Sequence, residues 1–212
     1  MACNVFGTPV TDATLKGMTE YHDKPIEAVD RARVALEMKN AEGKDTAARD
    51  FVDKIQTNEA AMKGVRCLIY NATGSPLKLV AAFERDGKVS VSPYPTLILN
   101  GQWASFVVST NFRGTVVYEA TQYPARQWLL AWDHILRPNE YNACYGEIRP
   151  KGTYSRKDVS EDEPPRDDLI TNLLASTFTH EAEDNGDVIF SAIANTDYPI
   201  CEAIMTRIAA LE

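Results

Sequence analysis

Residues 127–133 have the sequence Gln-Trp-Leu-Leu-Ala-Trp-Asp, in which large apolar side chains recur at every second position. Successive side chains of a β-strand point to opposite faces, so Trp128, Leu130 and Trp132 would share one face. Large aromatic side chains on one face indicate either a core or a lined groove. We therefore predict a strand here, with burial as the more common fate of its tryptophans.

Short apolar runs of the same kind lie on both sides of this segment. Turn residues separate them at a spacing of about 8–12 residues, which is typical of β-sandwiches. The predicted strands are VRCLIYN (65–71), PLKLVAAF (76–83), KVSVS (88–92), TLIL (96–99), ASFVVS (104–109), GTVVYEA (114–120), QWLLAWD (127–133) and NACYGEIR (142–149). Residues 65–150 therefore predict most of a β-sandwich domain.

The apolar residues have a helical period from Thr11 to about Met62, where three helices are expected. Thr11 and Asp45 are good amino-terminal caps for two of them. We therefore expect an α+β chain. Its N-terminal α-helical segment, residues 1–64, would pack on an antiparallel β-sandwich formed by residues 65–212.

The carboxy-terminal part begins with a polar, charged and proline-bearing stretch, residues 155–168, which predicts an exposed connection. A short amphipathic helix is expected from about 165 to 175. Two strands, 177–183 and 187–195, would follow as a hairpin, because Asp-Asn-Gly between alternating runs favours a tight turn. The last run, about 199–210, fits either a strand or a helix.

The composition narrows the class of protein. The chain has 212 residues and a net charge of −8, with 44% hydrophobic and 25% charged residues, which are ordinary globular values. An acidic chain is a poor candidate for nucleic-acid binding, because that affinity comes mainly from neutralising phosphates with Lys and Arg. The first residues lack the features of a signal peptide, and no run is long and apolar enough to span a bilayer. We therefore expect a cytoplasmic protein without a transmembrane segment or a nucleic-acid partner.

The four cysteines, Cys3, Cys67, Cys144 and Cys201, are widely separated and form no CxxC pair. In a reducing compartment they are most simply buried thiols. A metal site or a disulfide is the alternative if strand pairing brings two or three of them together. The three histidines are scattered too, so the sequence predicts neither a metal site nor a cofactor.

A family resemblance is carried by RARVALEMKNAEGKD (31–45), CLIYNATG (67–74), PYPT (93–96), NGQW (100–103), WLLAWD (128–133) and NACYGEIR (142–149). Together these motifs, which span about residues 4–150, resemble the plant family of 23 kDa jasmonate-induced proteins. The resemblance implies a stress- or defence-associated cytoplasmic protein of plants, and no settled biochemical activity comes with it.

The stretch CLIYNATG also contains a glycosylation sequon at Asn71. Without a signal peptide Asn71 should not meet the glycosylation machinery. The side chains of Asn71 and Thr73 can instead bond the local backbone, and Gly74 can adopt a positive φ. We therefore interpret the sequon as a turn that closes the first strand onto the second.

A second resemblance concerns the fold. A strand, an Asn-x-Thr-Gly turn, a meander and an aromatic strand occur in the order found in the actinoporin-like β-sandwich of pore-forming toxins and fungal lectins. In the toxins, a tyrosine-rich pocket after the aromatic strand holds a choline headgroup. The matching positions here are Trp132, Pro138, Tyr141 and Tyr145. Because the N-terminal region is more charged than the membrane-inserting helix of the toxins, the resemblance implies binding and not lysis.

Two functional hypotheses remain open. The first is a non-enzymatic module that binds a glycan, a choline-type lipid headgroup or a small metabolite through aromatic residues, with Tyr94 and Trp103 as further candidates. The second is an enzyme whose acid–base site forms only in the fold. Its candidate residues are Asp133, His134, Glu140 and Tyr141.

A simple criterion separates the two hypotheses. A pocket with two titratable groups within hydrogen-bond reach, at least one of them with a perturbed pKa, would favour the enzyme. The sequence contains no nucleophile elbow, cysteine-protease signature or phosphate loop, so no catalytic residue is assigned and the binding hypothesis is preferred. The N-terminal helices could also pack on a second copy, so a homo-oligomer is an open alternative.

Overall fold

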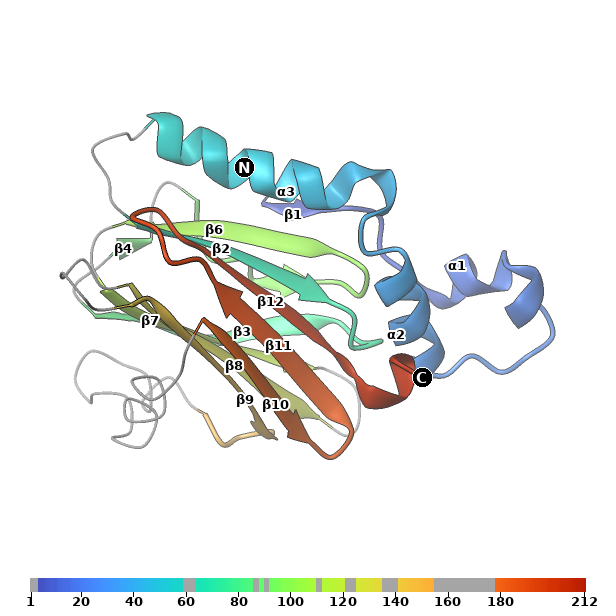
Figure 1. The fold of residues 1–212 in the computed structure, drawn as a ribbon. Coiled ribbons are helices and arrows are strands. Elements are labelled where there is room, and N and C mark those ends of the chain that lie inside the picture. Colours follow the sequence, from blue (N-terminus) through green and yellow to red (C-terminus); the bar gives the residue numbers. More distant parts are fainter. Residues whose placement is uncertain are drawn as a thin grey trace.

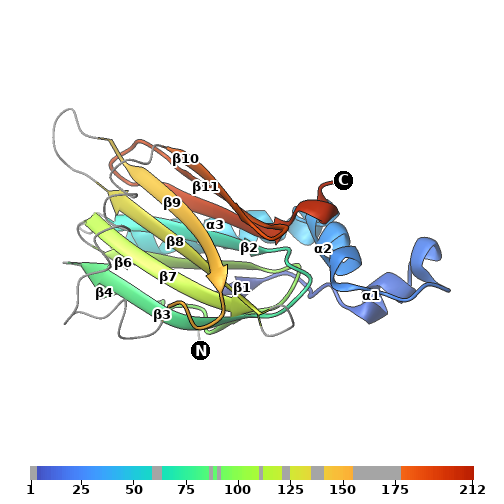
Figure 2. The same cartoon turned by 90° about the horizontal axis from the view of Figure 1, so that it is seen from below.

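A computed structural model of the chain describes residues 4–58, 64–85, 88–89, 92–109, 112–120, 125–134, 141–154 and 178–212. Two β-sheets face each other as a sandwich, and helix α3 lies across the outer face of one of them (Figure 1). Figure 2 shows helices α1 and α2 beyond one end of the sandwich. The predicted β-sandwich with a packed N-terminal helical segment is therefore confirmed.

Within these described ranges, the larger sheet has seven strands in the order β1-β6-β2-β12-β11-β10, with β4 also paired to β6. Its strands are β1 (Val5–Phe6), β2 (Gly64–Asn71), β4 (Lys88–Val89), β6 (Trp103–Ser109), β10 (Thr179–Asp184), β11 (Asp187–Ile193) and β12 (Ile200–Arg207). The smaller sheet has the order β5-β3-β7-β8-β9. Its strands are β3 (Leu77–Arg85), β5 (Leu97–Ile98), β7 (Phe112–Ala120), β8 (Arg126–His134) and β9 (Ala143–Pro150).

The last run of the sequence is the strand β12, followed by a single 3₁₀ turn, η3 (Ile208–Ala210). This strand pairs in parallel with β2, with Cys201 opposite Cys67, whereas the other strand pairs of both sheets are antiparallel. The prediction of an antiparallel sandwich therefore has one exception. Local sequence could not show it, because the partner of β12 lies more than a hundred residues earlier in the chain.

The core between the two sheets contains Trp128, Leu130 and Trp132, as the alternation along residues 127–133 predicts. The intervening residues Leu129 and Ala131 are also buried, in a separate apolar cluster on the other face of β8. Strand β8 is therefore covered on both sides, which explains why its sequence is nearly continuously apolar.

Three helices form as predicted: α1 (Asp12–Lys16), α2 (Ala28–Glu37) and α3 (Lys44–Asn58), with single 3₁₀ turns η1 (Thr19–Tyr21) and η2 (Ala41–Gly43) between them. Thr11 caps α1 through a capping box with Thr14. Asp45 does not cap α3, because the helix begins one residue earlier, at Lys44. No described helix is both long enough and apolar enough to cross a membrane.

The helices bury their apolar faces against the outer face of the larger sheet. Leu15, Val34 and Ala48 pack there with Tyr70 and Trp103 in a second apolar cluster. The N-terminal segment also contributes β1, which pairs with β6. The segment is therefore joined to the sandwich by both side-chain packing and backbone hydrogen bonds.

The turn after β2 has the structure that its sequence predicts. Asn71 is fully buried, and its amide nitrogen donates 2.8 Å hydrogen bonds to the carbonyl oxygens of Ser75 and Ile98. Gly74 has a φ of +76°. The Asp184-Asn185-Gly186 hairpin is also confirmed, with positive φ at Asn185 and Gly186. The predicted connection at 155–168 and the predicted helix at 165–175 lie outside the described residues.

Candidate ligand-binding groove

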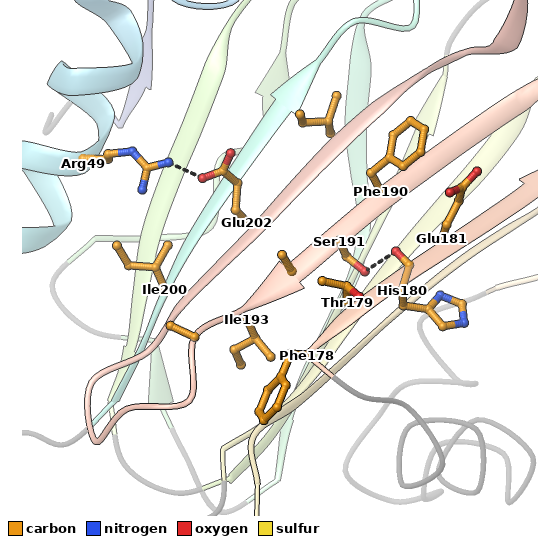
Figure 3. Close-up of a pocket in the computed structure, with 13 residues that line it drawn as sticks. Arg49, Phe178, Thr179, His180, Glu181, Phe190, Ser191, Ile193, Ile200 and Glu202 are labelled. Carbon is orange, nitrogen blue, oxygen red and sulfur yellow. Dashed lines mark hydrogen bonds and ion pairs between the residues drawn. The ribbon is translucent and has the colours of Figure 1, made fainter.

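A groove of about 750 Å³ lies on the outer face of the larger sheet, over strands β10, β11 and β12 and beside helix α3 (Figure 3). The apolar side chains that line it include Phe178, Phe190, Ala192, Ile200 and Ile204. Its volume is within the range of roughly 300–1,000 Å³ that is usual for small-molecule sites. We call this cavity the outer groove.

Strand alternation explains why this surface is apolar. Cys201, Ala203 and Met205 of β12 point into the sandwich core, so Ile200 and Ile204 point outward. Helix α3 packs mainly on β6 and β2 and leaves the outer faces of β10 and β11 beside it (Figure 1). The outward apolar residues of β11 and β12 therefore form a floor, and α3 forms one wall.

The polar lining of the outer groove includes two carboxylates and one guanidinium group. Arg49 of α3 forms an ion pair with Glu202 of β12 across the wall (Figure 3). Glu181 of β10 is exposed, and no ion pair joins it to another described residue. The charged residues of the lining, Arg49, Glu181 and Glu202, therefore carry one more negative than positive charge.

His180 contributes to the lining of the outer groove, but its imidazole ring points away from the side chains of Phe190 and Ile200 (Figure 3). Its Nδ1 accepts a 3.2 Å hydrogen bond from the backbone N–H of Gly146, and its ring lies 4.5 Å from that of Tyr145. Burial lowers the pKa of His180, although the nearby carboxylate of Glu147 acts in the opposite direction. His180 is therefore neutral at pH 7 and joins the edge of β10 to the edge of β9.

An exposed aromatic pair stands at one end of the outer groove. The rings of Tyr141 and Phe178 meet edge to face, with centroids 5.8 Å apart and an interplanar angle of 84°. Their exposed fractions are 63% and 40%, which is unusual for side chains of this size. Phe178 lines the groove itself, so Tyr141 extends the aromatic surface beyond it.

The position of Tyr141 is fixed by its neighbour Asn142, which is buried. The Asn142 amide nitrogen donates to the carbonyl oxygens of Ala194 (2.8 Å) and Thr196 (3.1 Å), and its Oδ1 lies 2.8 Å from Nδ1 of His134. These bonds connect the start of β9 to the turn between β11 and β12. These hydrogen bonds therefore hold Tyr141, and with it the aromatic pair, in a fixed position beside the outer groove.

The two tryptophans predicted as binding residues are both buried. Trp103 is 2% exposed, packs against Tyr70 with tilted rings whose centroids are 4.9 Å apart, and donates its indole N–H to the carbonyl of Lys39. Trp132 is 1% exposed and lies in the sandwich core, 6.0 Å from Phe106. Neither ring presents a free face to a ligand in this structure, so we do not include them in the site.

The structure does not bring the remaining predicted residues together. Tyr94 is half-buried against Phe106, and Tyr145 is half-buried against His180. Pro138 lies outside the described residues. Of the predicted binding residues with a described position, Tyr141 is the one that is exposed beside a cavity.

The residues of the alternative acid–base site are also separated. Asp133 and His134 are consecutive in β8 and point to opposite faces. Asp133 forms a 2.7 Å ion pair with Arg113, whereas His134 bonds Asn142 on the other side. Glu140 lies outside the described residues. Strand alternation, which the sequence already indicates, keeps the first two groups from acting on one substrate.

A titratable pair with a perturbed pKa does exist, but away from both cavities. The Tyr154 hydroxyl hydrogen-bonds the carboxylate of Glu147, and burial raises the pKa of Tyr154 well above its usual range. Neither residue lines the outer groove or the second cavity, which has a volume of about 420 Å³ and lies beside α1 and α2. This pair therefore does not meet the criterion stated above for a catalytic pocket.

The second cavity is a junction between the helices and the turns of the sandwich. Arg31 donates to the carbonyl of Gly74 and forms an ion pair with Asp12, while Asn100 bonds the backbone of Val10, Arg31 and Gly74. These polar groups bond one another. The residues that line this cavity therefore hold α1 and α2 against the turns of the sandwich.

Cys67, Cys144 and Cys201 are buried free thiols, as predicted, whereas Cys3 lies outside the described residues. Burial raises the pKa of Cys144 to about 12, so its thiol is protonated at neutral pH. Among the residues that the structure describes, no group of three or more His, Cys, Asp or Glu side chains could hold a metal ion.

Sequence reasoning missed the outer groove, although β12 carried a signal. Its outward residues Ile200 and Ile204 are as apolar as its inward ones, and a strand that is apolar on both faces is usually covered on both. No pattern in the sequence indicated that Arg49 would line the groove, because α3 meets Glu202 only through the tertiary fold.

Comparisons with known proteins agree with this architecture. The family described as Nakanori-like protein matches residues 6–209. The 23 kDa jasmonate-induced protein of Hordeum vulgare is 36% identical over 163 residues, which are 73% of this chain and 76% of that protein. The crystal structure of the lipid binding protein Nakanori superposes with a TM-score of 0.82 at 20% identity, covering 96% of this chain and 100% of that one.

A Xerocomus chrysenteron lectin is a more distant structural neighbour, with a TM-score of 0.46 and 10% identity over 68% of this chain and 99% of the lectin. The resemblance to the jasmonate-induced proteins, which the sequence motifs indicate, is confirmed by the relative from Hordeum vulgare. Because the family match extends over nearly the whole chain, this protein belongs to the Nakanori-like family.

Proposed function

We propose that this protein is a non-enzymatic binding module that recognises the headgroup of a choline-type lipid with the Tyr141–Phe178 pair. The observation that carries the proposal is the exposure of two large aromatic rings on an ordered support beside the outer groove. The neighbour with a TM-score of 0.82 is described as a lipid binding protein, which supports this ligand class.

The charged residues that line the adjoining groove favour a cationic group. Aromatic faces attract quaternary ammonium groups through cation–π contacts. Glu181 adds a carboxylate to the adjoining groove, whereas Arg49 is already paired with Glu202. A zwitterionic choline headgroup therefore fits this surface better than an anionic one.

Vesicle flotation tests the proposal. The protein should float with phosphatidylcholine vesicles and less with phosphatidylglycerol vesicles. Tyr141→Ala and Phe178→Ala should each weaken phosphatidylcholine binding about tenfold, which corresponds to the loss of one desolvated cation–π contact and its apolar area. Leu211→Ala is the matched control, because Leu211 is 52% exposed, follows the 3₁₀ turn η3 that packs on α2, and does not line the outer groove.

Glycans and small metabolites are the alternative ligands, because sugars also stack on aromatic rings. A glycan array and a thermal-shift screen of plant metabolites, run on the wild type and on Tyr141→Ala, distinguish them from a lipid. Specific glycan binding without vesicle binding would replace the lipid with a sugar. Vesicle binding that is unchanged in both aromatic variants would overturn the choice of site.

The relative described as jasmonate-induced supports a proposal for the cellular setting. We propose that this protein acts in the cytoplasm as part of a stress or defence response of a plant. Its helices already bury their apolar faces against its own sheet, which supports a monomer over a homo-oligomer. Sedimentation equilibrium tests the oligomeric state, and cell fractionation after jasmonate treatment tests the location.

A further inference from the structure

The outer groove is shaped for an elongated apolar group and not only for a headgroup. Its floor follows β12 from Ile200 to Ile204, four residue steps that span about 13 Å of strand. Phe190 and Ala192 of the neighbouring strand β11 widen the floor, and α3 walls one side. A headgroup held at Phe178 would leave most of this length empty.

The charge of the lining limits the occupant further. Arg49 and Glu202 neutralise each other across the wall, which leaves Glu181 as the uncompensated charge of the lining. Glu181 lies on β10 directly opposite Phe190 of β11, so its carboxylate stands beside the apolar floor. A cation would be stabilised there, whereas an anion would meet a like charge.

We propose that the outer groove binds the hydrocarbon chain of one monomeric amphiphile whose cationic head lies near Glu181. The inference rests on the proposed function in one respect, because both proposals place part of the ligand against Phe178. It differs in the form of the ligand: a membrane headgroup is recognised on a surface, whereas this ligand is taken up singly from solution.

Calorimetric titration with octyl-, decyl- and dodecyltrimethylammonium ions, each kept below its micelle-forming concentration, tests the inference without any membrane. One ion should bind per protein molecule. Affinity should rise about fifteenfold with each added pair of methylene groups, if both are buried. Alkyl sulfonates of the same chain lengths should bind at least tenfold more weakly, because they lack the attraction to Glu181.

Three variants locate the site. Ala192→Trp fills the floor with a side chain that suits an exposed strand position, and it should abolish binding while the protein stays folded. Glu181→Gln should weaken binding of the cations about fivefold and remove the preference over sulfonates. Glu183→Gln is its matched control, since Glu183 is exposed on the same face of β10 but does not line the groove. Circular dichroism confirms folding of each variant.

The outcomes separate this inference from the proposed function. Loss of amphiphile binding in Ala192→Trp, with phosphatidylcholine flotation retained, supports a chain site in the outer groove. Any one of three results would overturn the inference of a chain site. These are an affinity that does not depend on chain length, equal binding of cations and sulfonates, and an unchanged affinity in Ala192→Trp. A wild type that binds the amphiphiles but ignores vesicles would contradict the proposed function alone.

Discussion

The hydroxyl of Thr73 donates a 2.9 Å hydrogen bond to the side-chain oxygen of Asn71, and both residues are fully buried in the turn after β2. The two functional positions of the sequon therefore bond each other and the backbone, and neither faces solvent. A glycan on Asn71 would require this turn to open. The motif therefore serves the fold, because both side chains are used up in the buried bonds of the turn.

Asn71→Ala should lower the free energy of unfolding by about 3 kcal/mol. It removes the amide donor to the carbonyl oxygens of Ser75 and Ile98 and the side-chain oxygen that accepts from the backbone N–H of Thr73. Buried groups that lose their partner cost about 1–3 kcal/mol each, although Ser75 keeps its bond from the Thr73 hydroxyl. Thr73→Ser is the control, because it keeps the hydroxyl, and it should cost less than about 1.5 kcal/mol. Equilibrium urea unfolding measures both values, and equal losses would contradict this account of the turn.

Gly74→Ala should separate helix α2 from the sandwich. A Cβ atom at this position would lie 1.9 Å from the carbonyl oxygen of Ala28, the first residue of α2, and the φ of +76° adds strain. We expect a loss of about 4 kcal/mol in the free energy of unfolding, from overpacking and backbone strain together.

Gly152→Ala provides the matched control for Gly74→Ala. Its φ of +85° is similar, but a Cβ atom there would meet nothing within 4 Å. This variant should lose only the cost of the left-handed conformation, about 1–2 kcal/mol. Similar losses of unfolding free energy in both variants would show that α2 shifts to accommodate the added methyl group at little cost.

Asp187 should make stability depend on pH. Burial raises its pKa from 3.8 to about 6, although the guanidinium groups of Arg126 and Arg207, 3.9 and 3.7 Å away, act in the opposite direction. The folded state therefore binds this proton more tightly than the unfolded chain. The stabilisation is complete below the unfolded pKa and is lost as the pH rises through the folded pKa.

The loss from Asp187 amounts to at most about 3 kcal/mol between about pH 4 and about pH 7. Asp187→Asn removes the titration, so its free energy of unfolding should fall less than that of the wild type over this interval. Asp50→Asn, on the exposed side of α3, controls for the loss of a carboxylate. Urea unfolding at several pH values measures the difference, and parallel curves for wild type and Asp187→Asn would contradict the prediction.

Asn142→Ala should affect stability and binding together. It removes the donor to the carbonyls of Ala194 and Thr196 and the partner of His134, so we expect a loss of about 3 kcal/mol. Because Tyr141 is the adjacent residue, binding to phosphatidylcholine vesicles should also weaken. Asn195→Ala removes one longer bond, 3.3 Å, and should change both quantities much less. Full vesicle binding by a folded Asn142→Ala protein would show that Tyr141 needs no such support.

The sequence by itself determined the local structure of this protein. Alternation along residues 127–133 placed Trp128 and Trp132 on one face of a strand, and Thr11 marked the start of α1. The residues of CLIYNATG specified a buried turn. These features depend on strand period, capping and turn chemistry, which act over a few residues and are therefore visible in a short stretch of sequence.

Only the tertiary structure decided which surfaces became a site. Trp103 sits beside a turn in the sequence, yet helix packing buries it against Tyr70 and the carbonyl of Lys39. Phe178 meets Tyr141 because β10 lies beside β9, and Arg49 meets Glu202 because α3 packs on a sheet that contains β12. Such contacts join residues tens to more than a hundred positions apart. They depend on how strands and helices assemble, and the local pattern of the sequence does not record that assembly.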